Sequence, residues 1–125
     1  MVPDRPKNLE DILDLLRAFV AERDWAQFHD PKNLVMALAS EVGELTALFR
    51  WVAGTEADGF AAVPANREKV GHEMADVAIC LLLLADRLDV DLLDAVARKI
   101  ELNAKKYPPE SSRGRAERPS NQSGR

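Results

Sequence analysis

The sequence contains a single cysteine, Cys80, and lacks any apolar run long enough to cross a membrane. One cysteine excludes an internal disulfide and is typical of proteins from a reducing compartment. The longest apolar run covers residues 77–85, far short of the roughly 20 residues that a transmembrane helix requires. The N-terminal segment is polar and lacks the apolar core of a signal peptide. We therefore expect a cytoplasmic protein that has no membrane partner.

The sequence also lacks an excess of basic residues and any alternating pattern typical of β-strands. Lys and Arg total 17 against 21 Asp and Glu, which gives a formal net charge of −4. This balance gives no reason to expect a nucleic-acid partner. Hydrophobic residues make up 46% of the 125 residues, which is enough for a single domain to bury a core.

Apolar residues recur at helical spacing in four segments, and capping residues precede three of them. Asn8 and Asp30 are good helix caps, and Pro31 suits the first position of a helix. Asp89 or Asp91 is expected to cap the last helix. The predicted helices run to about Arg23, from Pro31 to about Val52, from about Asn66 to Leu88, and to about Lys105.

The segments between and after these helices have no helical period. Residues 54–64 contain Gly, Pro, Thr and Asp and are predicted to form a loop. Residues 109–125 carry no large apolar side chain and are predicted to be a disordered C-terminal tail. We therefore expect one all-α domain of four helices over residues 1–108.

Two pairs of acidic residues stand out inside the second and third predicted helices. Glu41 and Glu44, and likewise Glu73 and Asp76, are three residues apart, so each pair lies on one face of its helix. On a helical wheel Glu41 and Glu73 fall within the apolar stripes of their helices, where a solvated acid is not expected. The alternative, acids that merely border a core, explains a single acid better than two such pairs.

Converging carboxylates need a cation or a proton. Two like charges about 4 Å apart repel by roughly 4 kcal/mol at an effective dielectric constant near 20. Ligands that are all oxygen favour Mg²⁺, Mn²⁺ or Ca²⁺ over zinc. Because Mg²⁺ often completes its shell with phosphates, the acids predict a phosphate-bearing substrate that is attacked by a metal-activated water.

A second group of candidates lies on the fourth predicted helix. Lys99 and Asn103 share its apolar face, and Tyr107 continues this side. A lysine near the C-terminal end of a helix is also favourable without any ligand. Next to a metal-bound phosphate, binding of the phosphate is the better interpretation.

Trp25, His29 and Trp51 form a third group. Aromatic rings offer a stacking surface for a flat nucleobase, and His29 can form a hydrogen bond with the edge of a base. The alternative is ordinary core packing, since tryptophans in small helical domains are usually buried. The residues alone leave these two interpretations open.

Four segments of this sequence resemble one known family. Along the chain they are residues 23–34, Glu41-Val-Gly-Glu44, Glu73-Met-Ala-Asp76 and residues 99–108. In this order they resemble the MazG-like all-α nucleoside triphosphate pyrophosphohydrolases, with the greatest similarity to the dCTP pyrophosphatase branch. The resemblance extends over about residues 8–108.

The resemblance implies a four-helix bundle that is completed by oligomerisation, as a homotetramer built from two dimers. It implies hydrolysis of a nucleoside triphosphate, most simply dCTP, between the α and β phosphates for house-cleaning of the nucleotide pool. The acids Glu41, Glu44, Glu73 and Asp76 would be the catalytic residues and would hold Mg²⁺, or Mn²⁺. The substrate-binding residues would be Lys99, Asn103 and Tyr107 for the triphosphate and Trp25, His29 and Trp51 for the base.

Two features of the sequence bear on these expectations. Residues 79–85 are apolar all round the predicted helix, which independently favours association with another copy. Cys80 stands where the resemblance predicts an aromatic residue, usually tyrosine, so either the substrate preference differs or Cys80 is simply a small buried side chain.

Two other functions stay open at this point. One is a pyrophosphohydrolase that acts on several triphosphates or on modified nucleotides. The other is a non-catalytic helical module in which the acids hold a structural cation or bind a basic partner.

Overall fold

The structure, a computed structural model, describes residues 5–116, and every regular element in this range is a helix. The all-α prediction is therefore confirmed. The long helices are α1 (Leu9–Glu22), α2 (Pro31–Phe49), α4 (Pro64–Arg87) and α5 (Leu92–Lys106). The short helices are η1 (Ala26–Phe28), η2 (Gly54–Glu56), α3 (Ala57–Ala62) and α6 (Pro109–Ser112).

The predicted capping residues begin three of the long helices. Side chains of Asn8, Asp30 and Asp91 each accept a hydrogen bond from the backbone three residues later, at the start of α1, α2 and α5. Of the two aspartates considered for α5, Asp91 is the cap. Asp89 instead adopts a left-handed backbone conformation, with φ of 54°, in the turn after α4. An aspartate tolerates this conformation better than most residues.

The predicted loop over residues 54–64 is wrong. This segment contains η2 and α3, and α4 already begins at Pro64. The ring of Phe60 in α3 packs edge-on against Phe49 at the end of α2, with 5.5 Å between the ring centroids. The Asn66 amide donates a hydrogen bond to the Phe60 carbonyl at 3.1 Å. A six-residue helix is too short to show a helical period in the sequence, and α3 is held by these contacts with the ends of its neighbouring helices α2 and α4.

Smaller differences occur at other helix ends. Helix α2 ends at Phe49, three residues before the predicted end, and a turn follows it. The short helix α6 lies within the segment that was predicted as a disordered tail. Residues 117–125 of that predicted tail lie outside the described residues.

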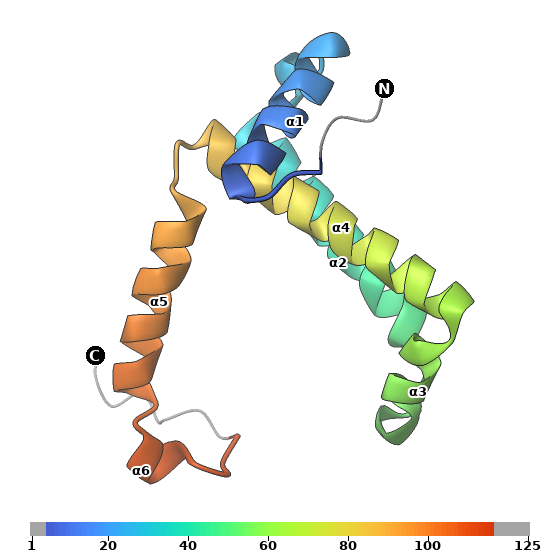
Figure 1. Ribbon diagram of the computed structural model, residues 1–125, viewed down its shortest axis with the longest axis vertical. Helices are drawn as coiled ribbons and strands as arrows, with labels where there is room; N and C mark the ends of the chain where they lie inside the picture. Colours follow the sequence, from blue (N-terminus) through green and yellow to red (C-terminus); the bar gives the residue numbers. More distant parts are fainter. Residues whose placement is uncertain (1–4, 117–125) are drawn as a thin grey trace. The chain divides into compact units, whose positions relative to one another are not determined.

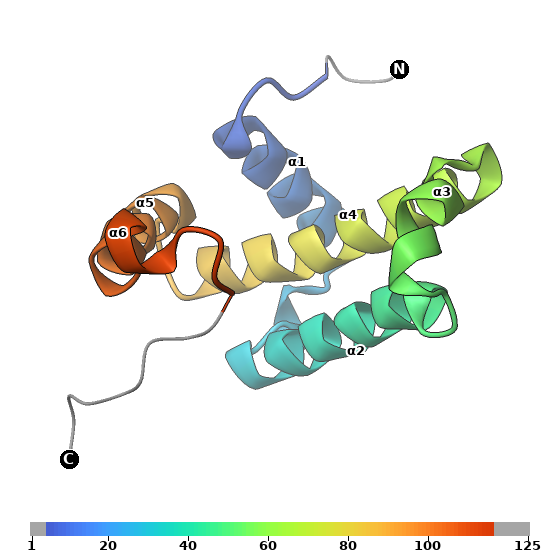
Figure 2. The same cartoon turned by 90° about the horizontal axis from the view of Figure 1, so that it is seen from below.

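The chain divides into two compact units, Met1–Val90 and Asp91–Arg125. In the first unit α2 and α4 lie side by side and antiparallel, joined through η2 and α3 (Figure 1). Figure 2 shows α4 between α1 and α2. The most buried apolar side chains of the described residues come from all three helices. They are Val20, Leu34, Leu82 and Ala85.

The second unit contains α5 and α6. A hydrogen bond from the Tyr107 backbone to the Asn103 carbonyl, at 2.8 Å, closes the last turn of α5. Among residues 5–116 no helix combines the length and the apolar character that crossing a bilayer requires.

Candidate functional site

The antiparallel pairing of α2 and α4 brings the acidic residues of the two helices together. Glu41 on α2 and Glu73 and Asp76 on α4 can each place one carboxylate oxygen within 4.8 Å of the others. The apolar stripes of the two helices face each other in this pair, so acids within the stripes must also meet. The structure therefore joins three of the four predicted carboxylates into one cluster.

Glu44, the fourth acid, lies exposed at the edge of this cluster. Its charge raises the pKa of both Glu41 and Glu73, which places it within electrostatic reach of each. Glu44 is thus close to the cluster, although it does not belong to the compact group of three.

Glu41 and Glu73 are half-buried and poorly satisfied. The Oε2 atom of each is buried and receives no hydrogen bond from any residue in the described part of the chain. Burial raises the pKa of both carboxyl groups, and the charges of Glu44 and Asp76 raise it further. A buried carboxylate oxygen without a partner is costly. The cluster therefore favours either a bound proton or a cation.

The residues fit a hard divalent cation. Every potential ligand in the cluster is a carboxylate oxygen, which suits Mg²⁺ or Mn²⁺. The two buried Oε2 atoms supply acceptors that no described residue uses. Cys80 follows Asp76 by one turn of α4 and is half-buried. Burial, together with the charges of Glu41 and Asp76, raises the pKa of its thiol, so Cys80 stays protonated and is a poor ligand.

The three residues predicted to bind the base do not meet within one chain. Trp25 follows α1 and packs edge-on against Phe19, with 5.7 Å between the ring centroids. His29 directly precedes the cap of α2, whereas Trp51 follows its last turn. A 19-residue helix is about 28 Å long. Trp51 is 86% exposed, and the neighbouring Arg50 guanidinium lies 5.1 Å from its ring centroid.

The predicted triphosphate-binding residues all belong to the second unit. Lys99 is exposed on α5, and Asn103 lies one turn later on the same side. Tyr107 is half-buried at the C-terminal end of this helix. These three residues are therefore neighbours along one helix, as the sequence predicts.

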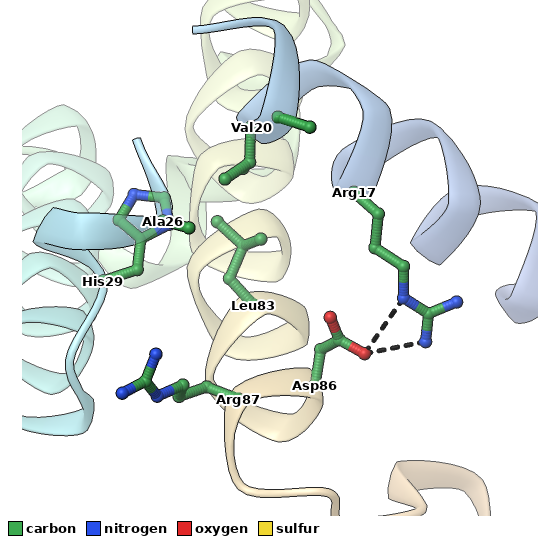
Figure 3. A pocket seen from close by; sticks show the side chains of 8 residues that line it. Arg17, Val20, Ala26, His29, Leu83, Asp86 and Arg87 are labelled. Atoms are coloured by element: carbon green, nitrogen blue, oxygen red, sulfur yellow. Dashed lines mark hydrogen bonds and ion pairs between the residues drawn. The ribbon is translucent and has the colours of Figure 1, made fainter. Parts of the chain in front are cut away.

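A cavity at the junction of α1, η1 and α4 was not predicted. It has a volume of about 360 Å³, and His29 is the only predicted site residue among those that line it (Figure 3). Three charged side chains also line it, namely Arg17 from α1 and Asp86 and Arg87 from the end of α4. Arg17 and Asp86 are 69 residues apart, and no local spacing in the sequence connects them.

Comparison with known proteins supports the resemblance seen in the sequence. The sequence model of the MazG-like family matches residues 8–120. Mouse (Mus musculus) dCTP pyrophosphatase 1 is 49% identical over 109 residues, which cover 87% of this chain and 64% of the mouse protein. Human (Homo sapiens) dCTP pyrophosphatase 1 is 45% identical over 106 residues, 85% of this chain and 62% of the human protein. The chain thus spans less than two thirds of the length of these curated relatives.

A solved structure has the same fold. The crystal structure of a pyrophosphatase from Archaeoglobus fulgidus matches with a TM-score of 0.75 and 36% sequence identity. The match covers 86% of this chain and 99% of the archaeal chain. The family match extends over most of the sequence and includes both acidic pairs. The chain therefore belongs to the MazG-like family.

Proposed function

We propose that this protein is a nucleoside triphosphate pyrophosphohydrolase that converts dCTP and water to dCMP and pyrophosphate in the presence of Mg²⁺. The observation that carries the proposal is the carboxylate cluster, in which Glu41 and Glu73 each have a buried oxygen without a partner among the described residues. A site of this kind suits phosphate hydrolysis, because a cation held by carboxylates can bind the phosphate oxygens and make a nearby water more acidic. The names of the mouse and human relatives support dCTP as the substrate.

In this proposal Glu41, Glu44, Glu73 and Asp76 hold the cation, with Mn²⁺ as an alternative to Mg²⁺. A divalent cation supplies charge neutralisation for the phosphates and makes a nearby water more acidic. Glu41 is our choice for the general base that takes a proton from the attacking water. Glu41 is half-buried in the carboxylate cluster, beside the position that the cation and its water would occupy.

Helix α5 supplies the remaining phosphate contacts in this proposal. Lys99 contributes a positive charge, Asn103 an amide and Tyr107 a hydroxyl group, and all three are good partners for phosphate oxygens. Lys99 would offset the charge that develops on the pyrophosphate as the bond between the α phosphorus and the bridging oxygen breaks.

We further propose that the base pocket contains residues of two copies of the chain, within a homotetramer. Trp25 and His29 precede α2 and Trp51 follows it, so a pocket with all three needs Trp51 from a second copy. The exposure of large apolar side chains supports association. On α2 and α4 they include Val35, Met36, Val42, Met74 and Leu81. A function in cytoplasmic house-cleaning of the nucleotide pool follows from the same proposal.

Product analysis by chromatography tests the activity. The purified protein is incubated with each of the eight common nucleoside triphosphates, with Mg²⁺ and with chelator. We expect dCMP and pyrophosphate from dCTP, and only with the metal. Turnover of several bases would point to a broad-specificity enzyme. Absence of turnover with all eight would contradict the proposal and favour modified nucleotides or a non-catalytic module.

A further inference from the structure

The cavity between α1, η1 and α4 combines an apolar wall with three kinds of polar group. Val20, Ala26 and Leu83 form the apolar part, as Figure 3 shows. Asp86 contributes a carboxylate on one side, and His29 and Arg87 lie on the other side. The volume of about 360 Å³ lies within the range of about 300–1,000 Å³ that is usual for small-molecule sites.

Asp86 is held in place through one of its two carboxylate oxygens. Arg17 donates two hydrogen bonds to Asp86 Oδ1, from Nη2 at 2.7 Å and from Nε at 3.1 Å. The same guanidinium also contacts Glu10 and Asp14 at 3.0 Å each, which fixes it on α1. The second oxygen of Asp86 points toward Leu83 in Figure 3. The cavity thus contains an acceptor whose orientation is set by a neighbouring ion pair.

The opposite side of the cavity offers hydrogen-bond donors. The Arg87 guanidinium has five N–H groups, and the imidazole of His29 has a donor and an acceptor when neutral. Leu83 lies between these groups and Asp86 and offers an apolar contact for the face of a heterocycle. A carboxylate on one side and donors on the other complement a ring whose edge carries an amino group, then a ring nitrogen, then a carbonyl.

We propose that Asp86 is a specificity-determining residue, which accepts a hydrogen bond from the exocyclic amino group of a cytosine base in this cavity. Arg87 or His29 then donates to the ring nitrogen or the carbonyl oxygen of the base. This inference rests on the proposed function, because it names the part of the substrate that the cavity recognises. The rings of the proposed pocket would stack on the base while the cavity contacts its edge.

One wall of the cavity, formed by Leu83 and Arg87, lies on the same face of α4 as Asp76 of the carboxylate cluster, whereas Asp86 lies about 80° away from Asp76 and faces Arg17 of α1. At 100° per residue, Leu83 and Arg87 both fall within about 20° of Asp76. At 1.5 Å per residue they lie about 10 and 16 Å beyond it along the helix. A nucleotide whose phosphates lie at the carboxylates is therefore long enough to bring its base to the Leu83 and Arg87 wall, and Asp86 contacts the edge of the base from the α1 side.

This arrangement discriminates between amino and keto pyrimidines. Uracil and thymine carry a carbonyl oxygen where cytosine carries the amino group, and that oxygen would face the Asp86 carboxylate. Two acceptors in contact leave a buried polar group unpaired and repel each other. Sites that use a hydrogen bond to recognise a substrate reject analogues that cannot form it.

The decisive variant is Asp86→Asn, which replaces the acceptor by a group that also donates. We expect the ratio of kcat/KM for dCTP to that for dUTP to fall at least about tenfold. Asp14→Asn is the matched control, because Asp14 also binds Arg17 at 3.0 Å but does not line the cavity. An unchanged ratio in Asp86→Asn, or an equal loss for both substrates, would show that Asp86 only joins α1 to α4.

A binding measurement tests the cavity without catalysis. The chain has two histidines, His29 and His72, and His72 does not line the cavity. With chelator present, titration with dCMP should shift the imidazole NMR signals of His29 and leave those of His72 unchanged. Binding of dUMP should be at least about tenfold weaker. If the protein gives this result but hydrolyses no triphosphate, the inference about the cavity is supported and the proposed function is contradicted. Equal affinity for dCMP and dUMP would overturn the inference.

Discussion

Glu41 and Glu73 are residues at which ligand binding and folding make opposite demands. Each has a buried carboxylate oxygen without a hydrogen-bond partner in the described chain, and each has a raised pKa. A hydrophobic or neutral side chain at either position would satisfy the apolar stripe better. Functional sites often carry local costs of this kind, which the rest of the fold must offset.

Glu41→Gln should therefore make the metal-free protein more stable and the enzyme inactive. The substitution removes one charge from the cluster but keeps the size of the side chain. We expect Tm to rise by a few degrees in chelator, the stabilisation by Mg²⁺ to be lost, and kcat to fall by at least about 10²-fold. Glu68→Gln, an exposed acid on the same helix as Glu73, should change none of these. A Glu41→Gln protein that still gains stability from Mg²⁺ would exclude Glu41 as a ligand.

The pH dependence of stability follows from the same two residues. Their pKa values in the folded protein lie above the ordinary value of 4.5, so the folded state binds protons more tightly than the unfolded state. Their contribution to stability is fully present below pH 4.5 and is lost as the pH rises through the raised values. Metal-free wild-type protein should thus lose stability relative to the Glu41→Gln/Glu73→Gln variant with increasing pH.

Urea unfolding of both proteins in chelator, between pH 4 and pH 8, measures this difference. Subtraction removes the titration of groups that both proteins share, such as the Arg17–Asp86 ion pair. The two free energies of unfolding should converge at the acidic end of the range. A difference that stays constant with pH would show that Glu41 and Glu73 do not titrate abnormally.

At the scale of the helices, local sequence patterns predicted where individual helices begin. They did not predict the contacts between helices. The caps Asn8 and Asp30 act on backbone groups only three residues away, and the sequence identified both. The convergence of the acids followed from helical periodicity. By contrast, α3 depends on contact between Phe60 and Phe49, and the cavity depends on contact between Arg17 and Asp86. Such pairs require knowledge of how the helices pack.

Asp30→Ala tests how much the cap contributes to α2, the helix that carries Glu41 and Glu44. The Asp30 side chain accepts a hydrogen bond from the Asn33 backbone at 2.9 Å. Its loss leaves a backbone donor unpaired, and we expect the free energy of unfolding to fall by about 1 kcal/mol. Glu68→Ala, which removes an exposed acid that does not cap α4, should change it by less than about 0.5 kcal/mol. Equal effects in urea titrations would contradict the role of Asp30 as a cap.

At the scale of the whole molecule, the chain leaves much apolar surface uncovered. Few large side chains of the described residues are buried, and within the first unit Val35, Met36 and Met74 on α2 and α4 are 50–61% exposed. Exposed apolar surface of this extent is typical of interfaces. The sequence predicted association from the apolar residues 79–85, and the helix that it predicted from Pro31 to about Val52 already separates His29 from Trp51, but only the structure shows that Trp51 is exposed.

Mixing two inactive variants tests whether one base pocket contains residues of two chains. A His29→Ala chain lacks the base-binding side chain that precedes α2, and a Trp51→Ala chain lacks the one that follows α2. Each homo-oligomer should therefore have low kcat/KM for dCTP. If His29 of one copy and Trp51 of another share a pocket, a mixed pair contains one intact pocket and one doubly defective pocket. Random pairing of equal amounts would restore roughly a quarter of the wild-type sites.

The experiment unfolds and refolds the two variants together and compares their dCTP hydrolysis with that of each variant refolded alone. Light scattering on the same samples reports whether the refolded mixture has the mass of four chains. Recovery of activity requires a pocket made by two copies, because no single chain in the mixture has both residues. A tetramer that recovers no activity would instead place the contributions of His29 and Trp51 in different sites.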